Sequence, residues 1–311
     1  MSWILVALLA YFFLACANLF DKFLVDNVVS SSQAYAFIAC LMGASVVVAA
    51  PWLLQWPGFY WLILDLLSGA VFAVALWLLY EALRRGEASQ TLVFVGALTP
   101  IFSIIFSMVF FKEHFSTLEW FGFATLISGS LIIALLPKDK NLFARLMLKL
   151  RITQNIKSGS LLIALFAALA YSVYFIASKY TYSAQPFASA FIWNRLGAAI
   201  FVLLFLIRKR DREKIFGAFQ KPKHNKHKVL VFFNQIMGSL GFVLQNYAIF
   251  LGSVALVNAF QGVQYAFIII LSSILAVLSP KLLKEKFSWR SFLQKAAAVG
   301  VIGLGIYFIM V

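Results

Sequence analysis

The chain has 311 residues, of which 63% are hydrophobic and only 12% are charged. Soluble domains are roughly 45–50% apolar and about 25% charged, so this composition excludes an ordinary soluble fold and predicts an integral membrane protein. The net charge of +15 does not indicate a nucleic-acid partner, because the basic residues stand in short segments between apolar runs, where they flank membrane spans and meet lipid headgroups.

Ten apolar runs follow one another along the chain, each near the roughly 20 residues that cross a bilayer as a helix. These runs are too long and too uniform for the strands of a membrane barrel. The first run lacks a basic N-terminal region and is too long for a signal peptide. The predicted fold class is an all-α integral membrane protein with ten transmembrane helices. The predicted helices cover residues 3–20, 34–54, 61–83, 89–111, 118–136, 159–178, 187–207, 229–250, 254–279 and 291–310.

Two of the connections are longer than the rest. Residues 137–158 include the basic amphipathic stretch "NLFARLMLKLRITQNI", which predicts a helix lying in the membrane interface. Residues 208–228 are basic and hydrophilic, and we expect a solvated loop. His224 and His227 in this loop are spaced i, i+3, but a solvated loop is a better interpretation of this spacing than a metal site.

The two halves of the chain resemble each other in sequence. The segment "AYAFIACLMGA" (34–44) matches "ASAFIWNRLGA" (188–198), and "KEHFS" (112–116) matches "KEKFS" (284–288). A weaker match joins "YEALRRG" to "NYAIFLG", and the three matches occur in the same order in both halves. Agreement at three places in one order predicts two repeats of five helices.

Because five is an odd number, the second repeat is turned upside down relative to the first. We therefore predict residues 1–137 as repeat one, 138–157 as a basic connector and 158–311 as an inverted repeat two. Inverted repeats are typical of secondary transporters, whose substrate site lies near the bilayer midplane between the repeats.

The repeat plan, the small residues at helix ends and a glutamate just after the fourth and ninth helices ("FFKEHFS", "LLKEKFS") resemble the EamA-like family of the drug/metabolite transporter superfamily. The resemblance covers the whole chain. It maps the family glutamate onto Glu113 and Glu285 and the family proline of helix four onto Pro100, whereas helix nine reads "QYAF" without a proline. It implies secondary transport of small metabolites by alternating access, and its motifs are diffuse and speak to fold more than to substrate.

The distribution of charge predicts an orientation. The connections after odd-numbered helices hold 22 Lys and Arg residues, and those after even-numbered helices hold 2. The positive-inside rule places the basic set, including 137–158 and 208–228, in the cytoplasm and both termini outside. The resemblance implies cytoplasmic termini instead, and we follow the charge count. The expected location is a multi-pass position in the bacterial inner membrane.

Arg195 is a lone charge within the apolar segment "FIWNRLGAA". An arginine near the centre of a membrane helix costs about 2.5–3.5 kcal/mol, and the equivalent residue in repeat one is Leu41. Arg195 therefore binds an anionic group of the substrate or gates the cavity, or else it forms a structural ion pair with Glu81 or bonds to backbone carbonyls. Its neighbours Trp193 and Asn194 are where repeat two departs from repeat one, and they are further candidates for substrate binding.

Three more charged residues at helix ends are candidates for coupling or gating. Glu81 is the best candidate for a proton-titrating carboxylate, although an interfacial ion pair with Arg85 at i+4 is the favoured interpretation of this residue. Lys22 and Lys179 stand at equivalent ends of helices one and six, where they gate the cavity or extend to the headgroups.

Amide and hydroxyl side chains recur on several of the predicted helices. Groups of this kind need partners in a membrane, so their faces must point into the bundle, where they line a polar cavity or join helices. The predicted substrate-binding residues are Arg195, Asn194, Trp193, Asn18, Tyr171, Tyr174, Gln235, Asn246, Asn258, Gln261 and Tyr265.

These features together predict a secondary transporter that exports a small polar metabolite, amino-acid-like or anionic, by alternating access. The alternative is a flippase of a lipid-linked or nucleotide-sugar-type substrate. An enzyme is not expected, because no predicted span contains a histidine or a known catalytic motif. Cys16 and Cys40 lie in apolar runs, so neither a disulfide nor a metal or other cofactor is expected. The expected partners are the substrate and the bilayer, with monomer and dimer both open.

Overall fold

The computed structural model describes residues 2–27, 31–85, 88–135, 158–219, 225–278 and 289–310, and all regular structure within these ranges is helical. Each of the ten predicted apolar runs coincides with one or more helices in the described parts. The elements are α1 (Ser2–Asn27), α2 (Ser32–Gly43), η1 (Ala44–Ala49), α3 (Ala50–Leu53), α4 (Phe59–Arg85), α5 (Ala88–Phe110), α6 (Thr117–Leu135), α8 (Ser158–Tyr182), α9 (Phe187–Leu203), η3 (Leu204–Ile207), α10 (Lys209–Phe219), α11 (Asn225–Leu251), α12 (Val254–Ala259), α13 (Gln261–Leu278) and α14 (Trp289–Met310).

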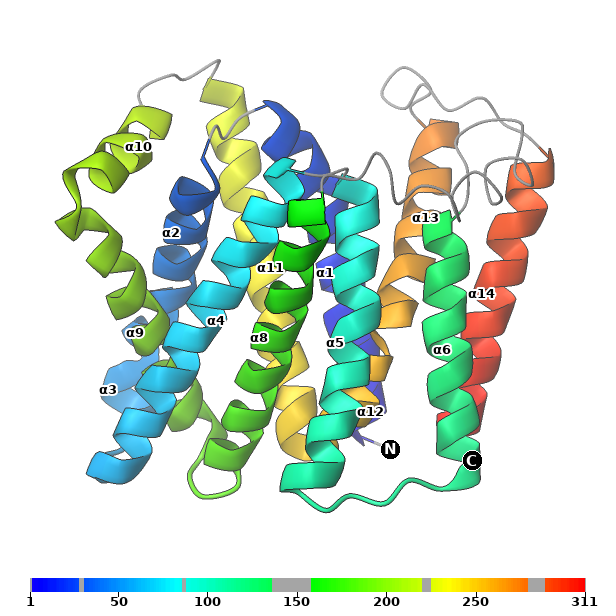
Figure 1. Cartoon of the computed structure of the whole chain (residues 1–311), viewed down its shortest axis with the longest axis horizontal. Coiled ribbons are helices and arrows are strands. Elements are labelled where there is room, and N and C mark those ends of the chain that lie inside the picture. Colours follow the sequence, from blue (N-terminus) through cyan, green and yellow to red (C-terminus); the bar gives the residue numbers. More distant parts are fainter. Residues whose placement is uncertain are drawn as a thin grey trace.

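The long helices stand side by side and alternate in direction along the chain, and the two chain ends lie at the same end of the bundle (Figure 1). Helices from the two halves of the sequence pack against each other. Helix α1 packs on α11, α4 on α8 and α9, and α6 on α14. The core is therefore shared between the halves, and it places residues far apart in the sequence around one interior space.

The surface is that of a membrane protein. Four segments of the described chain are long and apolar enough to cross a bilayer: Ser32–Leu53, Phe59–Arg85, Gly159–Tyr182 and Phe187–Ile207. Shorter apolar helices accompany them. Large apolar side chains point outward, with Val48 and Ile207 each 77% exposed, while many Ser, Asn and Gln side chains are buried. Such an extended apolar surface is stable in lipid and not in water.

Helices α4 and α9 approach each other closely. A Cβ atom on Gly69 of α4 would collide with the carbonyl oxygen of Asn194, and one on Gly197 of α9 would collide with that of Leu66. Small residues at a membrane-helix interface allow the two backbones to touch in this way. In α14, only Gly305 of the segment "GVIGLGI" packs closely on α6, and Gly300 and Gly303 have open space.

The apolar run 254–279 is interrupted, contrary to the single helix predicted there. Helix α12 ends at Ala259, and α13 begins at Gln261. The hydroxyl of Tyr11, on α1, donates a 2.8 Å hydrogen bond to the carbonyl of Val257. A buried break in a membrane helix needs such partners for its released backbone groups. Because the partner comes from another helix, the sequence of the run alone did not reveal the break.

The prediction of a solvated loop over 208–228 was wrong for much of its length, because Lys209–Phe219 forms α10. This helix is amphipathic, with Ile215 fully buried and α2 as its neighbour. Asp211 lies in its first turn, where a negative charge is favourable, and contacts Lys214 at 3.7 Å. Residues 220–224, including His224, and the interfacial helix predicted within 137–158 lie outside the described residues, as does Glu285.

Candidate substrate-binding cavity

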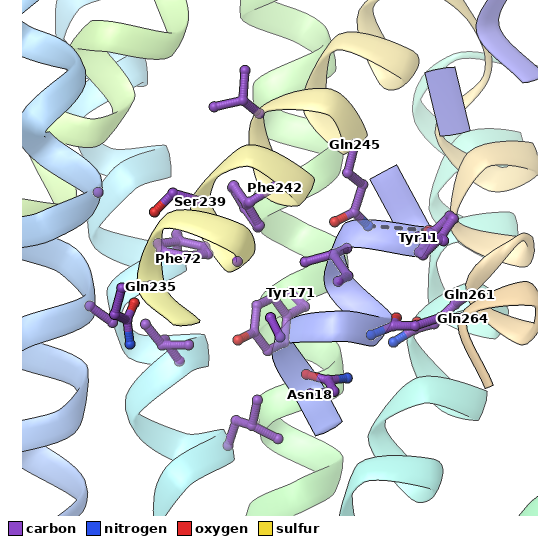
Figure 2. A pocket seen from close by; sticks show the side chains of 18 of the residues that line it. Tyr11, Asn18, Phe72, Tyr171, Gln235, Ser239, Phe242, Gln245, Gln261 and Gln264 are labelled. Carbon is purple, nitrogen blue, oxygen red and sulfur yellow. Dashed lines mark hydrogen bonds between the residues drawn. The ribbon is translucent and has the colours of Figure 1, made fainter. Parts of the chain in front are cut away.

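A cavity of about 250 Å³ lies inside the bundle. In Figure 2, its side chains are gathered around one space, with Asn18 on α1, Gln235 and Ser239 on α11, and Gln261 and Gln264 on α13. Apolar and aromatic groups make up the rest of the wall, which is the usual composition of a small-molecule site. The polar lining residues are Tyr11, Asn18, Ser45, Tyr80, Thr99, Tyr171, Arg195, Asn234, Gln235, Ser239, Gln245, Gln261, Gln264 and Tyr265.

The cavity extends toward the end of the bundle where the basic connections leave the helices. Its lining reaches Leu83 in the last turns of α4, Leu92 in the first turns of α5 and Asn234 in the first half of α11. Its first lining residue on α4 is Phe72, and no earlier residue of this helix lines the cavity. The cavity is thus asymmetric along the bundle axis.

Arg195 lies at the inner wall of this cavity and is only 4% exposed. Its guanidinium carbon is 4.0 Å from the ring centroid of Phe72 and 4.5 Å from that of Phe242. Its Nη2 atom donates a 2.8 Å hydrogen bond to the hydroxyl of Tyr174. In the part of the chain that the structure describes, its Nε atom has no hydrogen-bond partner and no carboxylate lies within ion-pair distance of it. Aromatic faces therefore stabilise this cation in place of the ion pair with Glu81.

Behind Arg195, a buried hydrogen-bond network closes the wall. The hydroxyls of Tyr174 and Tyr182 both donate to Oδ1 of Asn246, at 2.8 and 3.0 Å. The amide nitrogen of Asn246 donates to the carbonyl of Phe242 at 2.9 Å. Tyr174 and Asn246, both predicted to bind substrate, therefore stand behind the lining and hold Arg195 and α11 in position.

A second network joins four helices on the other side of the cavity. Gln245 Nε2 donates to the hydroxyl of Tyr11 at 3.2 Å and lies 3.4 Å from Oδ1 of Asn258. Asn258 in turn donates to Ser103 at 2.8 Å. Asn258 is 1% exposed and does not line the cavity. Its amide fixes α12 against α5, so its contacts are those of a residue that joins helices.

Two predicted site residues beside Arg195 face away from the cavity. Asn194 is fully buried and donates to Ser68 and Ser178 at 2.9 and 3.2 Å, between α4 and α8. The indole of Trp193 donates to the backbone carbonyl of Gln55 at 3.1 Å. Successive residues of a helix point in directions about 100° apart. Of Trp193, Asn194 and Arg195 on α9, only Arg195 therefore lies at the cavity wall.

Glu81 and Lys179, two of the three charged residues predicted for coupling or gating, do not line the cavity. Glu81 accepts hydrogen bonds from Ser32 at 2.6 Å, Arg84 at 2.8 Å and Arg85 at 2.6 Å, which is the ion-pair arrangement. The ammonium group of Lys179 donates to three carbonyls at the end of α11 rather than extending to the headgroups. The side chain of Lys22 lies outside the described residues.

The structure thus brings Arg195, Asn18, Tyr171, Gln235, Gln261 and Tyr265 of the predicted set together at the cavity. Sequence reasoning missed Tyr11, Asn234, Gln245 and Gln264, which also line it. Three of these are amides next to, or one turn from, an amide that was selected, so an amide cluster was the available signal. Sequence reasoning also missed Asp65. Like Arg195, this residue is a lone charge within an apolar run, and it is fully buried.

The family glutamate and proline that the resemblance mapped onto repeat one have structural contacts. The carboxylate of Glu113 accepts a 2.6 Å hydrogen bond from Ser253, the residue that caps the start of α12. Pro100 lies inside α5, where the preceding carbonyl of Thr99 accepts a 2.9 Å hydrogen bond from Ser172 of α8. Glu113 therefore contacts the start of a helix, and Pro100 lies where α5 lacks a backbone N–H donor.

Comparisons with known proteins agree with this architecture. The model of the EamA-like transporter family matches residues 1–135 and 158–311. An uncharacterized transporter from the cobO 3′ region of a Sinorhizobium species is 31% identical over 139 residues, which are 43% of this chain and 96% of that protein. A crystal structure of another protein shares the fold, with a TM-score of 0.66 and 16% identity over 98% of this chain and 95% of its own. The family match covers both halves of the molecule, and the chain belongs to the EamA-like transporter family.

Proposed function

We propose that this membrane transporter is a secondary transporter that exports a small polar metabolite, amino-acid-like or anionic, by alternating access. The observation that carries the proposal is Arg195, a cation at the wall of the interior cavity without a carboxylate partner among the described residues. A substrate carboxylate or phosphate would supply the missing charge. The amides around the cavity would bind the remaining polar groups of such a substrate.

The architecture that we infer for this function is ten transmembrane helices in two inverted repeats, residues 1–137 and 158–311, joined by a connector at 138–157. Support comes from the alternating direction of the helices and from the position of both chain ends at one end of the bundle. The charge distribution supports a bacterial inner membrane orientation with 137–158 and 208–228 in the cytoplasm. In that orientation the cavity extends toward the cytoplasm, as an exporter requires for loading.

A ligand screen on the purified full-length protein tests the proposal. Thermal unfolding is measured with amino acids, dicarboxylates, phosphorylated metabolites, nucleotide sugars and lipid-linked sugars. Because a ligand at 100 times its Kd stabilises the folded state by about 2.7 kcal/mol, a true substrate gives a clear rise in Tm. We expect an anionic solute among the hits, and stabilisation by a lipid-linked or nucleotide sugar alone would favour the flippase alternative.

Arg195→Gln is the decisive variant, and Arg84→Gln is its matched control because the Arg84 side chain is 56% exposed at the helix end. Arg195→Gln should abolish both the rise in Tm and the uptake of the labelled hit into proteoliposomes, while Arg84→Gln retains both. Unchanged stabilisation and uptake in Arg195→Gln would overturn the role of Arg195 in binding.

A further inference from the structure

Asp65, in the second turn of α4, is a carboxyl group with no exposed surface. Its Oδ2 atom accepts a 2.6 Å hydrogen bond from Gln185, in the turn between α8 and α9. Its Oδ1 atom has no partner, and no basic side chain of the described ranges lies within ion-pair distance. A buried carboxylate ion without a cation is strongly destabilising, so this site requires a positive charge that the described residues do not supply.

Few hydrogen-bond donors are available to Asp65. The hydroxyl of Thr181 is near this carboxyl group, but it donates to the carbonyl of Ser178 at 3.0 Å. Oε1 of Gln185 and Oδ1 of Asn194 are also buried without a hydrogen-bond partner. The Asn194 amide nitrogen is occupied by Ser68 and Ser178, whose hydroxyls lie 3.1 Å from each other. Buried acceptors without donors are rare in native proteins. Here three such acceptors occur between α4, α8 and α9, and a proton on Asp65 would turn one of them into a donor.

No charged group from the neighbouring helices neutralises Asp65. Arg195 of α9 bonds to Tyr174, and Lys179 of α8 bonds to the carbonyls of α11. The hydroxyl of Tyr182 donates its hydrogen bond to Asn246. Described residues of α5 include no titratable side chain. The remaining titratable side chains on the described helices packed against α4 are Tyr171 and Tyr180 on α8 and Tyr35 and Cys40 on α2.

Asp65 lies outside the cavity, before its first lining residue on α4. The lining residues of α4 run from Phe72 to Leu83, toward the basic end of the bundle. Asp65 precedes Phe72 by seven residues, which is about 10 Å along the helix. Asn194 and Arg195 are consecutive on α9. Asn194 donates to Ser68, which follows Asp65 by three residues on α4, and Arg195 lies at the cavity wall. Helix α9 therefore connects the part of α4 that carries Asp65 to the cavity wall.

We propose that Asp65 is a proton-binding site, that it holds a proton in the conformation described, and that loss of this proton accompanies closure of the cavity at the basic end. The step moves one proton between water and the carboxylate and transfers no electrons. The coupling rests on the proposed transport function, whereas the proton site itself is measured without any substrate. The proton would enter from the end of the bundle opposite to the cavity.

Infrared difference spectroscopy on the full-length protein in nanodiscs, between mildly acidic and mildly alkaline pH, tests the site. We expect a carbonyl-stretch band of a protonated carboxyl group that disappears at alkaline pH, shifts when the protein carries ¹³C-labelled aspartate, and is missing in Asp65→Asn. Glu81→Gln, at the other end of the same helix, should retain the band. A band that persists in Asp65→Asn would overturn the proposal.

The isotope shift is measured on the unaltered protein, so the test stands even if Asp65→Asn fails to fold. Absence of any aspartate band, together with stabilisation by sodium chloride but not choline chloride, would identify a metal-cation site and overturn the proton site. Neither result depends on Arg195 or on the ligand screen, so the failure of this proposal and that of the transport function are distinguishable.

Labelling of a cysteine at the cavity tests the coupling. Leu83→Cys, in a background with Cys16 and Cys40 replaced by alanine, is treated with a water-soluble maleimide. We expect labelling to be several-fold faster at acidic pH, after correction for the pH dependence of a free thiol. With Asp65→Asn, which resembles the protonated form, labelling should stay fast at both pH values. An unchanged pH dependence in that variant would overturn the coupling.

Discussion

The hydroxyl group of Tyr174 accepts a 2.8 Å hydrogen bond from Nη2 of Arg195. Both residues are buried, and the same hydroxyl donates to Asn246. This tyrosine oxygen on α8 therefore helps to orient the arginine at the cavity wall, together with the aromatic rings of Phe72 and Phe242. This dependence makes the role of Tyr174 testable apart from substrate binding.

Tyr174→Phe removes that oxygen and should destabilise the protein. A buried donor and a buried acceptor each lose a partner, which costs about 1–3 kcal/mol per group. The measurement is the unfolding midpoint in detergent. Tyr307→Phe is the control, because Tyr307 is 59% exposed and its replacement should change stability by less than about 0.5 kcal/mol. Equal effects of the two substitutions would contradict the network.

Gly69→Ala should be strongly destabilising, because the new methyl group meets the backbone of Asn194 at the crossing of α4 and α9. Overpacking of this kind typically costs about 1–3 kcal/mol, and here the obstacle is backbone rather than a side chain that could move. Gly303→Ala is the matched control, since no atom of the described chain lies within 4 Å of its added Cβ. A neutral Gly69→Ala would refute the close approach.

Lys179→Met should destabilise the end of α11. The ammonium group of Lys179 lies 2.8 Å from the carbonyl oxygens of both Ile249 and Gly252, and loss of hydrogen bonds from a charged donor costs about 1.5–3 kcal/mol. We expect faster amide exchange in the last turn of α11, measured by mass spectrometry. If Lys179 extended to the headgroups instead, this exchange would not change.

Tyr11→Phe should loosen the break between α12 and α13. Without the hydroxyl, the carbonyl of Val257 loses its cross-helix donor and Gln245 loses an acceptor. The expected loss of stability is about 1–3 kcal/mol, with increased amide exchange confined mainly to Val254–Ala259. Protection that stays unchanged in this segment would show that α12 is held by other contacts.

The sequence predicted the helices well because bilayer thickness dictates the length of each apolar run, and the family resemblance was confirmed over both halves. The sequence did not predict toward which neighbours the polar side chains of a helix point. Arg195 and Asn194 are neighbours in sequence, yet Arg195 bonds to Tyr174 at the cavity wall and Asn194 bonds to Ser68 between the helices. The break at Phe260 was hidden because its partner is Tyr11, more than 240 residues away.

Asp65 shows a second reason why the sequence did not predict the whole site. Its apolar neighbours in "LILDLL" identify it as a lone charge, just as those of Arg195 do. Its burial follows from α8 and α9 packing around it, which no local pattern specifies. Conversely, Lys179 and Glu81 were correctly predicted near helix ends. The partner of Lys179 is a carbonyl in the last turn of α11, and the partner of Glu81 is an arginine in the last turn of α4.

The close approach of Gly69 to the backbone of Asn194, and of Gly197 to that of Leu66, joins a helix of each half of the chain without an intervening layer of side chains. Sliding along such a seam would drive carbonyl groups into Cα atoms, because interdigitated backbone has no rotamers to exchange. If the two halves change their relative position, this seam can turn but not shear, so it marks the axis of rotation. The largest displacements should then occur at the helices farthest from it, α6 and α14.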